Sequence, residues 1–407
     1  MFTNTLFTQD NLFVLHGMNS ASVDLIYLDP PFNSKRLYSA PVGSKAAGAA
    51  FKDMWTWEDV NNAYLEGMIE KYPSLAQFIL ATKDAHSKAM AAYLAYMAQR
   101  ILEMHRVLAN TGSFYLHCDP TASHYLKFLL DGIFGRTNFR NEIIWCYRGG
   151  GSSKSNFAKR HDVILRYSKT NDFVFNDEDI RIPYQAEGMG RKDDAMWGKH
   201  KGSDKVYKPN PLGKIPEDWW TINALNANDP ERTGYPTQKP LALLHRIIKA
   251  SSKAGDIVLD PFCGCVTTCV AAQQLGRRWI GIDIEKKSSA ILIERLGNDA
   301  GIFSDFIHRS DIPKRTDIMT IAPDAGIKRR LYDQQHNCCN GCGSAFELRH
   351  FDIDHIIPKA KGGGDYYENF QLLCASCNRI KGDRPMEYLM TRLRTIEKAQ
   401  AKISFGD

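Results

Sequence analysis

The sequence predicts an α/β fold followed by a small metal-binding domain, and three observations lead to this prediction. Short apolar runs alternate with amphipathic stretches, which is the βαβ pattern of strands and helices in an α/β fold. Residues 180–235 are rich in glycine, proline, lysine and tryptophan, so they predict an irregular insertion. Two Cys-x-x-Cys pairs near the end predict a metal site. These features suggest a first domain at residues 1–303, a linker at 304–325 and a second domain at 326–407.

Bulk composition limits the class of protein. A chain of 407 residues is too long for one ordinary compact domain. Its hydrophobic content of 43% and charged content of 24% are near the globular average, so a large core is possible. The net charge of +6 permits a polyanionic partner without establishing one. The sequence shows neither a signal-peptide pattern nor an apolar run of membrane-spanning length. We therefore expect a cytoplasmic protein with reduced thiols and no membrane partner.

Periodicity predicts the elements of the first half. Residues 11–28 have the pattern of strand, turn and strand, whereas residues 38–84 are mixed and aromatic and predict an insertion. Residues 85–108 predict a helix that ends at Asn110-Thr111-Gly112. The apolar face of that helix contains Met90, Tyr93, Leu94, Met97, Ile101, Met104, Val107 and Leu108. The next strands are expected at residues 113–118, 142–147 and 162–168.

Regular alternation returns after the irregular insertion. A helix is expected at residues 241–250 before a strand at 257–259, and a helix at 267–275 before a strand at 279–282. The linker at 304–325 is polar and contains two prolines. These elements complete the predicted sheet.

The tetrapeptide Asp29-Pro30-Pro31-Phe32 follows the apolar run at residues 25–28. The run predicts a buried strand that the prolines end, and ligands of open α/β sheets bind at the carboxyl ends of strands. Asp29 offers a hydrogen-bond acceptor there, the prolines hold rigid carbonyl groups, and Phe32 offers a flat apolar face. These groups suit the exocyclic amine of a planar base, which points to nucleic-acid chemistry.

A second turn follows the predicted strand at residues 257–259. Asp260-Pro261-Phe262-Cys263-Gly264-Cys265 leads into a helix, and Gly264 lets the backbone approach a ligand closely. Thr267 and Thr268 can cap the helix start. Asp283 ends the next strand, where an acidic side chain commonly accepts hydrogen bonds from ribose hydroxyls. Together these residues predict a site for an adenosine-containing cofactor.

Four motifs in order resemble those of the DNA amino-methyltransferases that modify adenine N6 or cytosine N4. They lie at residues 29–32, 157–168, 237–240 and 260–268, the order of the permuted subgroup in which the catalytic tetrapeptide precedes the cofactor loop. The resemblance covers about residues 8–300. It implies a mixed, seven-stranded Rossmann-like sheet, S-adenosylmethionine as cofactor, and target recognition by residues 180–235. The cofactor-binding residues that it implies are Asp260, Phe262, Gly264, Thr267, Asp283, Thr237 and Lys239.

The sequence departs from the family pattern at three places. The loop reads Gly264-Cys265-Val266-Thr267-Thr268 where the family usually has Gly-Ser-Gly-Thr-Thr, so Val266 replaces a glycine. Gly17-Met18 stands where Gly-Asp is common, so one cofactor contact is either absent or supplied by Asn19 or Asp10. The tetrapeptide ends in Phe32 rather than tyrosine, which preserves a stacking surface.

The resemblance also implies a mechanism in which the target base is flipped out of the duplex. Asp29 and the Pro30 carbonyl would accept hydrogen bonds from the base amine. Phe32 would stack on one face of the base and Phe157 on the other. A tetrapeptide that begins with Asp favours N6-adenine, with N4-cytosine as the alternative. Trp219-Trp220 could contact DNA or simply fill the core.

The two Cys-x-x-Cys pairs have the spacing of a tetrahedral structural zinc site. They are Cys339 with Cys342 and Cys374 with Cys377. A segment this small has little hydrophobic core, so the metal would contribute its folding free energy directly. A plain zinc ribbon that binds only a partner has the same spacing, so the cysteines alone do not indicate catalysis.

Residues between and beside the cysteines resemble the HNH endonucleases over about residues 330–385. The resemblance rests on Asp354-His355-Ile356-Ile357-Pro358, Gly362-Gly363-Gly364, Asn369 and Cys377-Asn378-Arg379-Ile380-Lys381. It implies a ββα-metal unit, a hairpin on a helix, that holds one catalytic Mg²⁺ or other divalent cation. Asp354 and Asn378 would bind the cation, His355 would be the general base, and Asn369 would orient the His355 loop.

Three functional hypotheses remain open from the sequence. The chain could methylate and cut DNA as a fused restriction-modification enzyme, or it could be a methyltransferase whose zinc domain only grips DNA. It could also be a phage or mobile-element protein with a homing or packaging nuclease. Each has double-stranded DNA as partner, permits a homodimer, and places the protein in the cytoplasm of a bacterial or phage-infected cell.

Overall fold

The computed structural model describes residues 4–32, 36–39, 50–53, 55–57, 68–69, 72–149, 154–184, 210–226, 228–285, 290–291, 306–318 and 321–404. The strands of the first domain are β1 (Thr5–Thr8), β2 (Val23–Leu28), β3 (Arg36–Ser39), β4 (Ala50–Asp53), β5 (Leu108–Cys118), β6 (Phe139–Cys146), β7 (His161–Ser168), β8 (Trp219–Thr221), β9 (Ile257–Asp260), β10 (Arg278–Asp283) and β11 (Ile307–Arg309). Its helices are α1 (Asn11–Gly17), α3 (Pro73–Ala85), α4 (Lys88–Val107), α5 (Ser123–Phe134), α6 (Leu241–Ser251) and α7 (Thr267–Gln274), with 3-10 turns η2 (Arg136–Asn138) and η3 (Glu178–Ile180).

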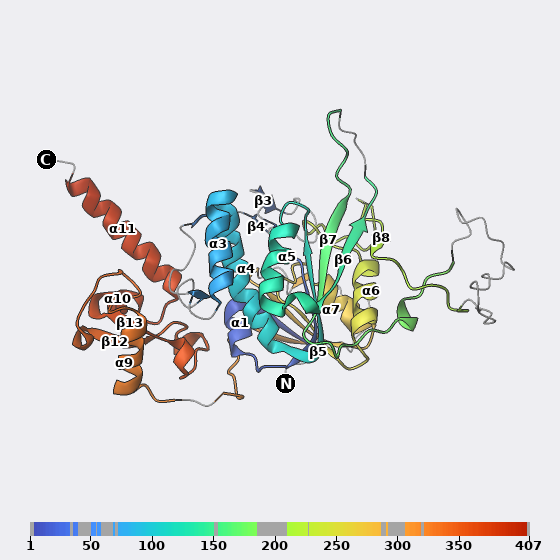
Figure 1. The fold of residues 1–407 in the computed structure, drawn as a ribbon. Coiled ribbons are helices and arrows are strands. Elements are labelled where there is room, and N and C mark those ends of the chain that lie inside the picture. The colour runs from blue at the N-terminus through green and yellow to red at the C-terminus, as the bar shows by residue number, and fades with distance from the viewer. Residues whose placement is uncertain are drawn as a thin grey trace, which may run out of the picture.

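One sheet forms the centre of this domain (Figure 1). Its nine strands have the order β11-β1-β10-β9-β2-β5-β7-β6-β8. Neighbouring strands run parallel except where β7 pairs with β5 and β6. A separate antiparallel pair joins β3 to β4. The predicted α/β class with a mixed, Rossmann-like sheet is therefore confirmed, with nine strands where the family resemblance implied seven.

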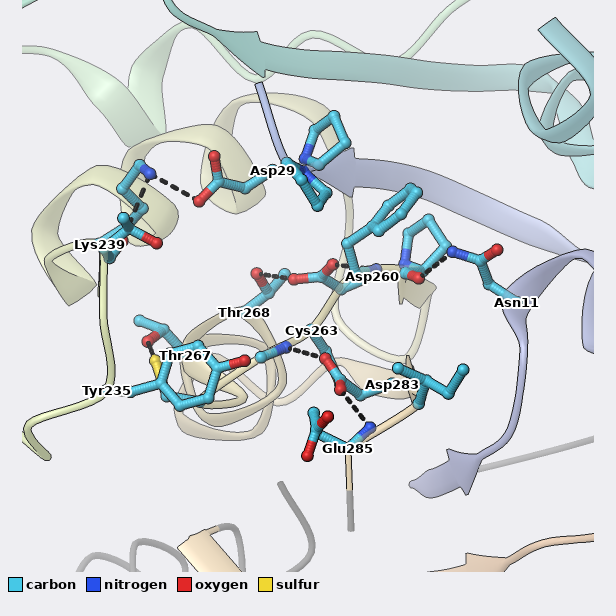
Figure 2. Close-up of a pocket in the computed structure, with 18 of the residues that line it drawn as sticks. Asn11, Asp29, Tyr235, Lys239, Asp260, Cys263, Thr267, Thr268, Asp283 and Glu285 are labelled. Atoms are coloured by element: carbon cyan, nitrogen blue, oxygen red, sulfur yellow. Dashed lines mark hydrogen bonds and ion pairs between the residues drawn. The ribbon is translucent and has the colours of Figure 1, made fainter. Parts of the chain in front are cut away.

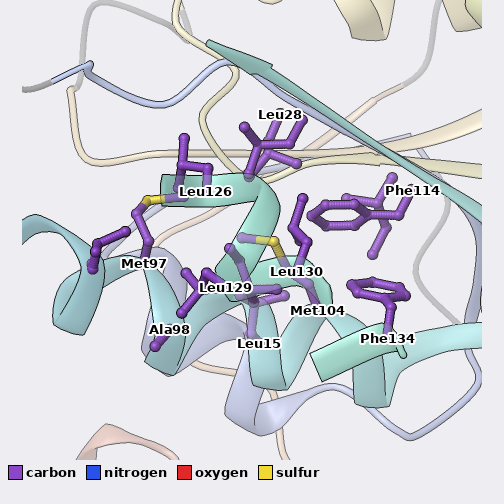
Figure 3. Close-up of a cluster of buried hydrophobic side chains, with 14 of the residues drawn as sticks. Leu15, Leu28, Met97, Ala98, Met104, Phe114, Leu126, Leu129, Leu130 and Phe134 are labelled. Carbon is purple, nitrogen blue, oxygen red and sulfur yellow. The ribbon is translucent and has the colours of Figure 1, made fainter. Parts of the chain in front are cut away.

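Helices cover both faces of the sheet. On one face, α1, α3, α4 and α5 bury a continuous apolar cluster that includes Leu15, Leu28, Met97 and Leu129 (Figure 3). On the other face, α6 and α7 pack against β9 and β10. Every apolar residue predicted for one face of α4 is buried, which confirms the period-3.6 pattern of this helix.

Four short elements differ from the sequence-based expectations. The predicted strand at the start of residues 11–28 is the helix α1, because Asp10 accepts a hydrogen bond from the Leu12 backbone N–H and caps it. The helix α3 lies in the predicted insertion at residues 38–84. The strands β8 and β11 lie in the predicted insertion and linker, where three-residue edge strands have almost no periodic signal.

Residues 180–235 are irregular over much of the part that the structure describes, as predicted. Residues 185–209 and 227 of this segment lie outside the described residues. Trp220 is buried, where its indole N–H donates to the Glu217 carbonyl, while Trp219 is 58% exposed. One tryptophan therefore fills the core and the other faces outward. No described helix combines the length and hydropathy that a membrane crossing demands.

The C-terminal domain is a hairpin packed between helices, drawn in orange and red in Figure 1. The antiparallel strands β12 (Phe351–His355) and β13 (Phe370–Cys374) pack on α10, and this arrangement confirms the predicted hairpin on a helix. The other elements are α9 (Ala325–Gln334), α10 (Ala375–Lys381), α11 (Met386–Ser404), η5 (Leu348–His350), η6 (Lys359–Lys361) and η7 (Tyr367–Asn369).

Candidate active sites

The carboxyl ends of three neighbouring strands bring the predicted residues to one edge of the sheet. Asp29 follows β2 directly, while Asp260 and Asp283 are the last residues of β9 and β10. The strand β9 lies between β2 and β10 and pairs in parallel with both. The helices that follow β2 and β9 cover opposite faces, so this edge is a topological switch point, where open α/β sheets bind ligands.

A cavity of about 330 Å³ opens at this edge (Figure 2). The tetrapeptide at residues 29–32 lines one side of it, and the glycine turn after β9 lines the other. Every residue predicted to bind the cofactor lies in its wall: Asp260, Phe262, Gly264, Thr267, Asp283, Thr237 and Lys239. Two motifs more than 200 residues apart in the sequence therefore face one shared space.

The two oxygens of the Asp29 carboxylate have different surroundings. The Lys239 Nζ donates to Asp29 Oδ2 at 2.6 Å and also lies 3.3 Å from the Thr237 carbonyl oxygen. Asp29 Oδ1 is buried, and among the described residues it has no hydrogen-bond partner. A buried carboxylate oxygen without a donor is costly, so this atom is ready to accept an N–H group from a ligand. Lys239 thus contacts Asp29 within the wall of the predicted cofactor site.

A buried histidine supports the ring of Phe32. The His117 and Phe32 rings are stacked, with centroids 6.1 Å apart and planes 20° apart. His117 bonds Asp162 Oδ2 through Nε2 at 3.1 Å and the Tyr27 hydroxyl through Nδ1 at 2.9 Å. Burial and the nearby Lys239 ammonium lower the pKa of His117, so its ring is neutral near pH 7. Phe157 is fully exposed and does not line the cavity, so the structure does not bring it to Phe32.

The glycine turn has two residues in the left-handed region. Gly264 has φ +47°, and a Cβ on it would lie 3.0 Å from the Tyr235 ring. Val266 has φ +57°, which a β-branched residue rarely adopts, at the position where the family usually has glycine. Val266 therefore takes a left-handed conformation without the freedom of a glycine. Asp283 Oδ2 accepts the Gly264 N–H at 2.7 Å and holds the turn against β10.

Asp260 lies at the base of this cavity, 3% exposed. Its carboxylate accepts a hydrogen bond from the Thr268 hydroxyl at 2.5 Å and from the Phe262 N–H at 3.0 Å. Burial nevertheless raises the pKa of Asp260 to about 7, because desolvation outweighs these two hydrogen bonds. A cationic ligand group would favour the ionised form.

In the C-terminal domain four cysteine sulfurs converge. The Sγ atoms of Cys339, Cys342, Cys374 and Cys377 all lie within 4.8 Å of one another. Tetrahedral zinc with Zn–S bonds of about 2.3 Å needs sulfurs about 3.8 Å apart, so the arrangement fits zinc. The backbone N–H groups of Gly341 and Cys374 donate to the Cys339 sulfur at 3.3 and 3.2 Å, which further favours a thiolate there.

His355 ends β12 beside a loop that one side chain fixes. Asn369 accepts the Ile357 N–H at 2.8 Å and donates to the carbonyls of Ile357 and Gly364 at 3.1 and 3.0 Å. His355 Nε2 lies 2.8 Å from Asp365 Oδ1. Asn369 therefore holds the loop that follows His355.

Asp354 and Asn378 each have a different protein partner. Lys381, fully buried, donates to Asp354 Oδ1 at 3.1 Å, and the Gln371 amide donates to Asp354 Oδ2 at 2.8 Å. Asn378 donates to Asp352 Oδ2 at 3.1 Å. The two predicted cation ligands, Asp354 and Asn378, therefore share no hydrogen-bond partner among the described residues.

Comparison with known proteins agrees with this geometry. Residues 23–294 match the family model described as DNA methylase, and residues 339–384 match the one described as HNH endonuclease. The chain belongs to the DNA methylase family. This DNA methylase carries a C-terminal HNH domain, so the shared cavity lies in the methylase part and the cysteine cluster in the HNH part.

Three curated relatives show how far the similarity extends. The type II methyltransferase M.EcaI of Enterobacter cloacae is 27% identical, over 77% of this chain and 74% of its own length. The DNA adenine methyltransferase YhdJ of Escherichia coli K12 is 27% identical, over 72% and 82%. The type II methyltransferase M.BglII of Bacillus subtilis is 32% identical over 51% of this chain, which spans 58% of that relative.

Several residues of the methylase cavity were not predicted from the sequence. Tyr235 and Glu285 lie in its wall, and so do Gln9 and Asn11 at the start of α1. The signal for these last two was the N-cap pattern before α1, which the strand prediction obscured. Of the two residues proposed to replace the missing family aspartate, Asp10 lines the cavity. Asn19 instead bonds Thr316.

The raised pKa of Asp260 predicts how the stability of the ligand-free methylase domain depends on pH. Folding raises the pKa of the Asp260 carboxyl from its ordinary value of 3.8 to about 7. The contribution of this group to the free energy of unfolding is therefore complete below pH 3.8 and is lost as the pH rises through 7. Between pH 5 and 7 we expect the Asp260 contribution to fall by roughly 2 kcal/mol, so the unfolding free energy of the wild type should fall by this amount relative to that of Asp260→Asn. All seven tryptophans precede residue 280, so their fluorescence during urea unfolding reports this domain alone. An equal pH dependence in the variant would contradict the assignment.

Proposed function

We propose that this protein is a site-specific DNA methyltransferase that moves the methyl group of S-adenosylmethionine to the N6 amine of a flipped adenine. We propose further that its HNH domain cuts or nicks DNA. The observation that carries the first proposal is the Asp29 carboxylate, whose Oδ2 is held by Lys239 while Oδ1 is buried and lacks a partner among the described residues. A base amine supplies the N–H donor that Oδ1 lacks.

The residues around the cavity fit the cofactor. Asp260 and Asp283 offer carboxylates, Phe262 offers an apolar surface, and Gly264 leaves room that a side chain would fill. Glu285 adds a carboxylate two residues beyond Asp283, beside the predicted ribose acceptor. When bound, S-adenosylmethionine supplies an electrophilic methyl group on a sulfonium, and a cavity lined with carboxylates complements its positive charge.

The catalytic residues then act on the amine. The nitrogen lone pair of an exocyclic amine is delocalised into the ring, so the free amine is a weak nucleophile. Asp29 Oδ1 and the Pro30 carbonyl accept hydrogen bonds from the N–H groups of this amine, and these bonds localise the lone pair toward the methyl group. Lys239 pairs with the Asp29 carboxylate and fixes its orientation. Phe32, supported by His117, stacks on the flipped base.

The HNH half of the proposal rests on His355 and the loop that Asn369 fixes. His355 would activate water, and Asp354 with Asn378 would hold Mg²⁺ or another divalent cation that polarises the scissile phosphate. Because the Lys381 ammonium pairs with the Asp354 carboxylate, a bound cation has to displace this ammonium or share the carboxylate with it. The four cysteines would hold a structural zinc ion.

Two observations favour adenine, and one alternative remains. The tetrapeptide begins with Asp29, and the relative YhdJ is named a DNA adenine methyltransferase. The second candidate function is a methyltransferase, of adenine N6 or cytosine N4, whose HNH domain only binds DNA. The occupied Asp354 favours that candidate for the HNH part.

The test incubates pure protein with unmodified plasmid, with S-adenosylmethionine alone or with Mg²⁺ alone. We expect N6-methyladenine with the cofactor and strand breaks with the metal. His355→Ala should keep methylation and lose at least about a hundredfold in cleavage rate, as loss of a general base predicts. The exposed His350 gives the matched control, His350→Ala, which should cleave normally. N4-methylcytosine would overturn the adenine assignment, and intact plasmid with every divalent metal would favour the binding-only domain.

A further inference from the structure

A second cavity, of about 310 Å³, lies where the two domains meet. Its wall combines residues of three segments: Gln9 from the methylase domain, residues 310–312 and 314 from the connection, and residues 359–362 from the HNH domain. Three lysines line it, Lys314, Lys359 and Lys361. Neither active site described above uses this cleft.

The connection between the domains is bound on both sides. Asn19 and Thr316 exchange two hydrogen bonds of 2.8 Å, and the Ser20 N–H donates to Asp317 at 2.8 Å. A Cβ on Gly17 would lie 1.9 Å from the Pro313 carbonyl oxygen, so these two backbones are in direct contact. The connection is therefore fastened to the methylase domain rather than free.

The HNH domain holds the other side of the same connection. The Ile321 N–H donates to the Asp365 carbonyl at 2.7 Å. A Cβ on Gly362 would lie 2.1 Å from the Ile312 side chain, so the HNH domain and the connection are also in contact there. The three segments thus build the cleft together, and its lysines are held at the junction of the domains.

The charge of the cleft is positive. Lys359 pairs with Asp365 at 2.8 Å, and Asp311, the acidic residue in the wall, pairs with Arg309. Lys314 and Lys361 have no ion-pair partner within the described part of the chain. Two unpaired ammonium groups that face one cleft attract an anion with spaced negative charges, such as the phosphates of a nucleic-acid backbone.

The position of the cleft links it to both active sites. Gln9 lines this cleft and the methylase cavity, and its side chain donates to the Ser310 carbonyl at 3.2 Å. On the HNH side, Asp365 contacts both Lys359 and His355 at 2.8 Å. A phosphate backbone in the cleft would therefore pass between the base-modifying cavity and the His355 loop.

We infer that this cleft is a binding site for the phosphate backbone of duplex DNA, with Lys314 and Lys361 as its phosphate contacts. The inference rests on the proposed function, because it takes DNA as the substrate, and it adds that one bound duplex is held at the junction of both domains. Contacts of this kind set position and affinity without reading sequence.

The test measures binding of the full-length protein to a labelled duplex of about 30 base pairs by fluorescence anisotropy at several salt concentrations. We expect Lys314→Gln/Lys361→Gln to weaken binding several-fold and to lower the slope of log K against log salt by about 2, since each lost phosphate contact removes about 0.9. Lys249→Gln/Lys253→Gln removes the same charge near the opposite edge of the sheet, before β9, and should leave the slope unchanged.

Each outcome decides a different point. An unchanged slope in the cleft variant, with normal wild-type binding, would overturn the cleft and leave the proposed function intact. An equal loss in the control variant would also overturn it, because the effect would then follow net charge alone. A wild type that binds no duplex would overturn the proposed function and the cleft together.

Discussion

Asp29→Ala is expected to lower the rate of methyl transfer by about a hundredfold to ten-thousandfold, the range for loss of a positioned acceptor or base. The substitution removes both the unpartnered Oδ1 and the partner of Lys239. A thousandfold loss corresponds to about 4 kcal/mol of transition-state stabilisation. The rate is measured in a single turnover with labelled S-adenosylmethionine and unmodified duplex.

Cofactor affinity provides the control for this variant. Asp29 lies across the cavity from the glycine turn, so the Kd of S-adenosylmethionine should change by less than about threefold. Asp29→Asn keeps an acceptor oxygen but loses the charge that pairs with Lys239. Its rate of methyl transfer should lie between those of the wild type and Asp29→Ala. Normal transfer by Asp29→Ala would remove Asp29 from the mechanism, whereas a large loss of cofactor affinity would place it in the cofactor site.

Cys377→Ser is expected to unfold the HNH domain. The hydrophobic core of this domain is small, and structural zinc contributes apparent binding free energies of about 10–16 kcal/mol in zinc-finger peptides at pH 7. The variant should contain less than one zinc ion per chain, become sensitive to protease beyond residue 325, and lose any cleavage activity. Methyl transfer should persist, because the methylase cavity lies in the other domain.

The neighbouring Cys338 supplies the matched control. Its thiol lies outside the four-sulfur cluster and contacts the His336 carbonyl at 3.4 Å. Cys338→Ser should therefore keep its zinc and its resistance to protease. Zinc content is measured by mass spectrometry after dialysis. Full zinc and protease resistance in Cys377→Ser would show that this cysteine is not a ligand.

Sequence periodicity predicted the sheet that positions the methylase site. The strand that precedes Asp29 and the strands that end at Asp260 and Asp283 are short apolar runs closed by a turn, and such runs are readable without a structure. Since parallel strands share an edge, their ends were expected to meet. The helix α1 was missed because seven residues give too little repeat to separate a helix from a strand.

Contacts between distant residues could not be predicted in the same way. Lys239 was assigned to the cofactor by its motif, yet its Nζ binds Asp29, 210 residues away. The partners of Asp354 also depend on how α10 packs against the hairpin, which spacing does not determine. His117 had no motif, and its stacking on Phe32 follows only from the pairing of β2 with β5.

The most direct measurement of the central claim is a crystal structure of the protein with a non-reactive analogue of S-adenosylmethionine and its target duplex. The account predicts an extruded adenine whose N6 lies within hydrogen-bonding distance of Asp29 Oδ1, with its ring on Phe32 and the analogue beside Gly264. A target base that enters elsewhere, or an analogue bound outside the cavity that Asp29 and Gly264 share, would contradict it.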